Sequence, residues 1–165
     1  MKKIITGIFI GTLVLVVLVL AGRPERGTEA ASLLSRSNDA LTVEEPARYD
    51  FGSISMAAGK VMRQFKVNNT GNKPVNIEKM YTSCMCTSAL LIIGEKRFGP
   101  VGMPGHTAIP YLNQIMGAGE SVIVEVTFDP AAHGPAGVGH IERTVTLENN
   151  AGQPVLLRFA ATVTP

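Results

Sequence analysis

The two cysteines of the chain, Cys84 and Cys86, have one residue between them and lie near the middle of the 165-residue sequence. Thiolates act as nucleophiles, redox centres and ligands for soft metal ions, so this stretch is the first candidate for chemistry. Residues two apart in a regular strand have Cα atoms about 6.5–7 Å apart, so a disulfide here requires a bend. Three interpretations stay open: a soft-metal site, a redox-active disulfide, and two packed structural thiols.

A metal site needs further ligands beside two thiolates, whether the ion is Cu(I) or Zn(II). Two Gly- and Pro-rich segments supply candidates, with Met103 and His106 in the first and His133 in the second. We therefore predict a ligand set of Cys84, Cys86, His106, Met103 and His133. Both Cu(I) and Zn(II) remain candidate cofactors.

Other classes of activity find no support in the sequence. It contains no Gly-x-Ser-x-Gly elbow, phosphate loop, His-Glu-x-x-His or Cys-x-x-Cys motif, and its carboxylates are scattered along the expected strands. The formal net charge is only +2, and no Lys/Arg cluster follows the N-terminal segment. We therefore predict that the chain is not an enzyme and does not bind nucleic acid.

The N-terminus has the pattern of an export signal. Lys2 and Lys3 precede an apolar run, residues 4–21, that contains no charge. The run is long enough to cross a bilayer, which favours a signal anchor, although small residues at its end also fit a cleaved signal peptide. We predict a signal anchor or signal peptide over 1–22 and a tether over 23–46. The remainder is then extracytoplasmic, anchored to the inner membrane or released into the periplasm if the signal is cleaved.

Residues 47–165 are predicted to form one all-β domain. Val, Ile, Thr and Phe alternate with polar residues, as in 120–128, and 17 Gly and 10 Pro supply turns. The expected strands are residues 47–54, 61–67, 75–80, 88–93, 120–128, 141–147 and 155–163. About seven strands with turn signals between them predict an immunoglobulin-like β-sandwich, with long loops at 94–119 and 132–139.

Four blocks of this domain resemble a bacterial family. They are residues 50–54, 65–74, 119–130 and the stretch Thr82-Ser83-Cys84-Met85-Cys86-Thr87. The family consists of exported Ig-like domains of unknown function with an S-C-x-C-T signature, akin to hydin-like and major-sperm-protein-like sandwiches. The resemblance implies an Ig-like fold and an extracytoplasmic place, and it implies no activity. The two long loops depart from the shorter family pattern.

From these features we expect a membrane-tethered, extracytoplasmic Ig-like module for binding or assembly in the cell envelope. Its partner would be an envelope protein, held by exposed strand edges or by the loop at 94–119. One alternative is binding or delivery of copper through Cys84 and Cys86. A second alternative is thiol–disulfide exchange by the same pair.

Overall fold

The computed structural model describes residues 40–44 and 46–165. The predicted signal segment, 1–22, lies outside the described residues, as does most of the predicted tether. Within the described part of the chain, no helix combines the length and the apolar character needed to cross a membrane.

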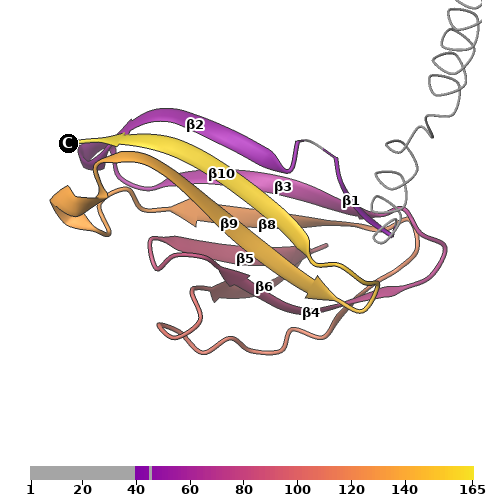
Figure 1. Cartoon of the computed structure of the whole chain (residues 1–165). Helices are drawn as coiled ribbons and strands as arrows, with labels where there is room; N and C mark the ends of the chain where they lie inside the picture. The colour runs from indigo at the N-terminus through magenta and orange to yellow at the C-terminus, as the bar shows by residue number, and fades with distance from the viewer. Residues whose placement is uncertain (1–39, 45) are drawn as a thin grey trace, which may run out of the picture. The chain divides into compact units, whose positions relative to one another are not determined.

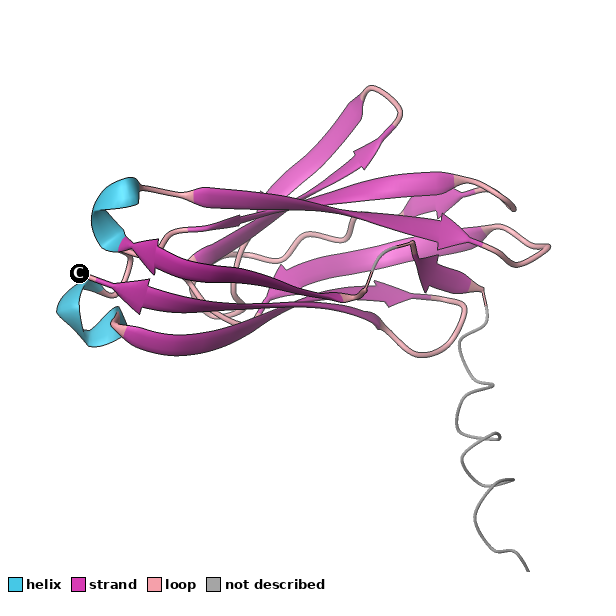
Figure 2. Cartoon of the chain, turned by 90° about the horizontal axis from the view of Figure 1, so that it is seen from above, coloured by secondary structure: helices cyan, strands magenta, loops and turns pink. Residues whose placement is uncertain are grey.

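Ten strands form a sandwich of two five-stranded sheets in the described residues (Figure 1). The first sheet has the order β1 (Leu41–Val43), β3 (Val61–Asn69), β8 (Ser121–Phe128), β5 (Thr87–Ile93) and β6 (Lys96–Val101). The second has the order β2 (Arg48–Ser55), β10 (Val155–Thr164), β9 (Gly139–Asn149), β4 (Val75–Thr82) and β7 (Gln114–Met116). Two short 3-10 helices, η1 (Met56–Ala58) and η2 (Gly134–Gly137), lie at the end where the C-terminus lies (Figure 2).

The alternating residues of the central strands make the core, as the sequence predicts. In β8, Val122, Val124, Val126 and Phe128 are all buried. The ring of Phe159 packs against that of Phe128 across the layers, with centroids 5.4 Å apart. Burying an apolar side chain of this size contributes about 1.5–3 kcal/mol, so these faces account for much of what holds the two sheets together.

The prediction of about seven strands is wrong, because the structure has β1, β6 and β7 in addition. β6 and β7 lie within 94–119, where a loop was expected, and pair with β5 and β4. β1 lies within the predicted tether, 23–46, and pairs with β3, so the tether prediction is wrong for these residues. All three are outermost strands that bury few side chains, and such strands need little hydrophobic alternation.

The topology brings two connections together at one end of the sandwich. β4 and β5 follow each other along the chain but belong to different sheets, so residues 83–86 cross between the layers. β5 also pairs with β8, with Thr87 opposite Phe128. The end of β8 therefore lies beside the start of β5, and the connection from β8 to β9 begins next to the crossing that carries both cysteines.

Candidate metal centre

The cysteines lie in a tight turn between β4 and β5. The N–H of Thr87 donates to the carbonyl of Cys84 at 3.1 Å and closes the turn. Cys84 and Cys86 are buried, whereas the Met85 side chain between them is 52% exposed. The N–H of Cys86 also donates to the Cys84 sulfur at 3.4 Å. The chain thus has a bend at this point, and both thiols are free and on its inner side.

The turn is tied to its surroundings by hydrogen bonds. The buried hydroxyl of Thr82 contacts the carbonyl oxygens of Cys84 and Thr87 at 3.0 and 3.1 Å. Ser83 extends the pairing with β9, because its N–H donates to the Thr144 carbonyl and its hydroxyl accepts from the Thr144 N–H, both at 2.9 Å. These contacts fix the backbone from which both sulfurs project.

His133 reaches the turn from the connection after β8. Asp129 begins this connection, and its N–H donates to the carbonyl of Cys86 at 2.9 Å. Its carboxylate accepts the N–H of Ala131 at 3.0 Å, which turns the chain back towards the cysteines. Gly137 packs closely behind His133, since a Cβ at position 137 would lie 3.1 Å from the His133 Cβ. His133 Nε2 lies 3.1 Å from Cys84 Sγ.

Cys84, Cys86 and His133 together form a potential metal-binding cluster. One ligand atom from each of the three residues lies within 4.8 Å of the others. Two thiolates and an imidazole are ligands that suit Cu(I) and Zn(II). The donor set therefore fits a soft or borderline metal ion.

Arg143 contributes a positive charge to this cluster. Its Nε donates to Cys86 Sγ at 3.3 Å, and its Nη1 donates to the carbonyl of Glu142 at 2.8 Å. Sequence reasoning did not identify Arg143 as a site residue. The sequence pattern could have indicated it, because Arg143 falls on the same face of its strand as Ile141 and Val145, where an apolar residue is expected.

The two thiols have different acidities. Burial alone would raise the pKa of Cys84, but hydrogen bonds with Cys86 and His133 and the charge of Arg143 lower it to about 7. Burial raises the pKa of Cys86, and its hydrogen bond to Cys84 raises it further, against the opposing effects of Arg143 and Thr87. Cys84 is therefore the thiol that ionises first.

The two other predicted ligands, Met103 and His106, line a separate hollow. His106 lies outside the group of three, and both residues line a hollow of about 220 Å³ together with Met85. Neither cysteine lines that hollow. Of the five predicted ligands, the structure thus brings Cys84, Cys86 and His133 together and places Met103 and His106 in a hollow that they share with Met85.

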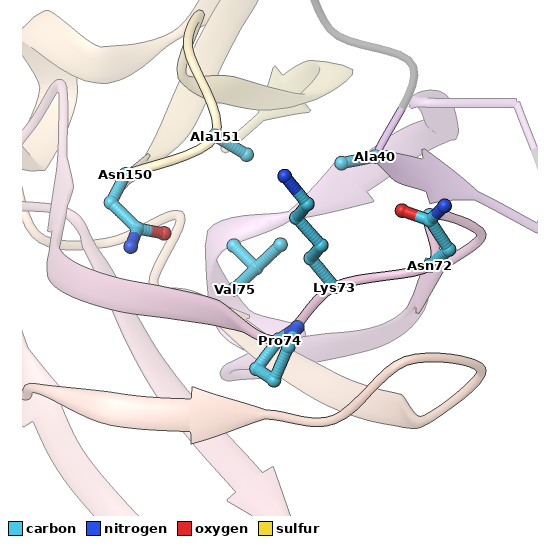
Figure 3. Close-up of a pocket in the computed structure, with 8 residues that line it drawn as sticks. Ala40, Asn72, Lys73, Pro74, Val75, Asn150 and Ala151 are labelled. Atoms are coloured by element: carbon cyan, nitrogen blue, oxygen red, sulfur yellow. The ribbon is translucent and has the colours of Figure 1, made fainter.

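A further hollow, of about 310 Å³, lies at the opposite end of β4 and β9 (Figure 3). Lys73 extends into it between Ala40 and Ala151. Its lining has no Cys, His or carboxylate, so it offers no chemistry comparable with that of the cysteine turn.

Comparison with protein families gives one match. Residues 41–92, which include both cysteines, match a family described as "Protein of unknown function (DUF1573)". No curated protein matches the chain.

Solved structures share the fold at low identity. A protein of unknown function from Porphyromonas gingivalis W83 is 12% identical with a TM-score of 0.54, over 74% of this chain and 46% of that one. The secreted serine protease VesC from Vibrio cholerae is 12% identical with a TM-score of 0.51, over 81% of this chain and 25% of that one. This chain thus spans less than half the length of either protein. With the family match, these likenesses support an Ig-like sandwich domain of uncharacterised function.

Proposed function

We propose that the chain is an extracytoplasmic Ig-like module that binds a soft metal ion, Cu(I), through Cys84, Cys86 and His133. The observation that carries this proposal is the cluster of three ligand atoms within 4.8 Å, drawn from two connections that the fold holds together. The backbone hydrogen bonds of the turn keep the two sulfurs on one side. The conformational entropy lost by these side chains when the ion binds is therefore small.

The number and type of ligands favour Cu(I). Soft thiolates select Cu(I), and a structural Zn(II) site almost always has four protein ligands, whereas the cluster supplies three. A hollow of about 200 Å³, lined by Cys86, Met85 and Asp129 among others, offers a route for the ion towards Cys86. Such a site suits uptake and transfer of copper better than permanent structural binding.

The extracytoplasmic location is part of the proposal. It rests on Lys2, Lys3 and the uncharged apolar run at 4–21, which are typical of an export signal. The same segment would attach the domain to the inner membrane if it is not cleaved. Outside the cytoplasm free thiols oxidise readily, and a bound Cu(I) ion would protect Cys84 and Cys86 from forming a disulfide.

The test is copper binding by the full-length protein, purified in detergent without reductant and loaded with Cu(I) anaerobically. We expect one copper per chain, held against a chromophoric Cu(I) chelator and lost in Cys84→Ser and Cys86→Ser. His133→Ala should weaken binding at least about tenfold, by loss of one of three ligands. His140→Ala is the matched control, since this side chain is 61% exposed and lies outside the cluster.

Two results of this experiment would contradict the proposal. Absence of copper together with absence of titratable thiols would favour a redox role through a Cys84–Cys86 disulfide. Absence of copper with two free thiols would leave the cysteines as packed side chains, and the domain would then be an interaction module.

A second candidate function is assembly with an envelope protein, and one surface feature favours it. Tyr111 and Ile115 are 67% and 61% exposed, and Ile115 lies on the outermost strand β7. Exposed apolar side chains beside a sheet edge are typical of binding surfaces. If this surface binds a partner, Tyr111→Ser with Ile115→Ser should abolish co-purification of one defined envelope protein, and Met62→Ser, on another strand, should not.

A further inference from the structure

The charges around the cluster suggest which ions it prefers, an inference that rests on the proposed metal-binding function. When they bind a metal ion, Cys84 and Cys86 are thiolates and carry two negative charges in total, whereas a coordinating His133 is neutral. Arg143 adds one positive charge that does not titrate in the physiological range. The four side chains together therefore carry one net negative charge.

Neighbouring charges do not alter this sum. Asp129, beside Cys86, pairs with Lys60 at 3.9 Å, and the two charges cancel. Glu142 pairs with Arg48, and its side chain is 56% exposed, so water screens it from the cluster. Among the residues that the structure describes, Arg143 is thus the charged side chain with a hydrogen bond to a cysteine sulfur.

The Arg143 guanidinium is held in place at the cluster. Nε donates to the Cys86 sulfur, Nη1 donates to the Glu142 carbonyl, and the side chain, which β9 carries, is partly buried. A partly buried charge in a fixed position interacts more strongly with an incoming ion than a mobile surface charge does.

We propose that Arg143 makes the cluster selective for a monovalent soft ion, Cu(I), over a divalent ion, Zn(II). With Cu(I) bound, the charges of the two thiolates, Arg143 and the ion sum to zero. With Zn(II) bound, one positive charge remains beside two buried sulfurs, and an uncompensated charge in such a place is costly. Arg143 touches no metal in this arrangement and acts on the ion through its charge.

The experiment compares Cu(I) and Zn(II) affinities of the full-length protein and of Arg143→Gln, each by competition with a chelator under anaerobic conditions. In Arg143→Gln the ratio of Cu(I) to Zn(II) affinity should fall by about tenfold or more, mainly through tighter Zn(II) binding. Arg143→Lys keeps the charge and should retain most of the selectivity. Arg143→Met, which keeps an apolar stem over the same strand, should behave as Arg143→Gln does.

The outcomes separate this inference from the proposed function. If the unaltered protein binds Cu(I) and the ratio is the same in Arg143→Gln and Arg143→Met, the selectivity inference is overturned while metal binding stands. If the unaltered protein binds neither ion, both are overturned. If affinity for both ions falls equally in every Arg143 variant, including Arg143→Lys, Arg143 has only a structural role and the inference is likewise overturned.

Discussion

The imidazole Nε2 of His133 lies 3.1 Å from Cys84 Sγ, although the two residues are 49 positions apart in the chain. The contact arises because the crossing from β4 ends at the start of β5, which pairs with the end of β8, where the other connection begins. The link between Asp129 N–H and the Cys86 carbonyl fixes one connection to the other. Cys84 and His133 therefore meet through the topology of the sandwich and not through local sequence.

The low pKa of Cys84 predicts how its reactivity depends on pH in the metal-free protein. With a pKa of about 7, its thiolate fraction rises with pH, from about a tenth at pH 6 to about nine tenths at pH 8. Alkylation by iodoacetamide, assigned by mass spectrometry, should rise over this interval at Cys84. Cys86, with its raised pKa, should react mainly at higher pH.

The matched variant for this measurement is His133→Ala. Loss of the imidazole removes a hydrogen bond that lowers the Cys84 pKa, so the midpoint should move upwards, towards the ordinary value of 9.0. A midpoint that is the same with and without His133 would contradict the geometry of the pair.

The Thr82 hydroxyl should matter for both stability and metal affinity. Thr82→Val keeps the shape of the buried side chain but leaves the carbonyls of Cys84 and Thr87 without this donor. We expect a loss of about 1–2 kcal/mol in the free energy of unfolding, measured with urea, together with weaker copper binding. Thr82→Ser retains the hydroxyl and should lose less of both. A larger loss in Thr82→Ser than in Thr82→Val would show that the methyl group, not the hydroxyl, is important.

Asn69 should stabilise the domain without affecting the metal centre. Its buried amide nitrogen contacts the carbonyl oxygens of Lys73, Met116 and Gly117 at 2.8, 3.2 and 3.0 Å. Asn69→Ala should lower the free energy of unfolding by about 2–3 kcal/mol, since buried carbonyls lose their donor. Copper affinity of the folded protein should not change, because Asn69 lies at the other end of the strands. Asn72→Ala, at an exposed position, is the control and should cost little.

Gly137 should control the position of His133. A Cβ at residue 137 would lie 3.1 Å from the His133 Cβ, closer than a normal contact. Gly137→Ala should therefore displace the imidazole and weaken copper binding several-fold, about tenfold at most, while the sandwich keeps its stability. Ala136→Ser, at the neighbouring exposed position, should bind copper normally. Unchanged affinity in Gly137→Ala would mean that the loop yields without moving His133.

The sequence contains most of the information on the two-layer core. Val122, Val124, Val126 and Phe128 alternate with polar residues because one face of β8 is buried against the other sheet. β6 and β7 were not predictable in this way. Their buried residues are few, Val101 and Met116 respectively, and their pairing depends on backbone hydrogen bonds with β5 and β4.

The site was predictable only in part, because the order of the strands in the sheets decides which candidate residues meet. The residue types identified Cys84, Cys86 and His133 as candidate ligands, but nothing in the sequence separates His133 from His106. The difference comes from sheet order, which places the connection after β8 beside the cysteine turn. Arg143 could have been identified from the sequence, because it is a charged residue on the apolar face of an expected strand.

The pairing of β1 with β3 determines where anything joined to the N-terminal side of the domain is attached. Leu41 pairs with Asn69, and the Ala40 carbonyl accepts the N–H of Thr70, so the described chain starts beside the hollow that Lys73 enters. The cysteine turn lies beyond the other end of β4, about 25 Å away for eight residues of strand. A label or immobilising support coupled at Ala40 itself would therefore leave the cysteine end free for a copper donor or acceptor to approach.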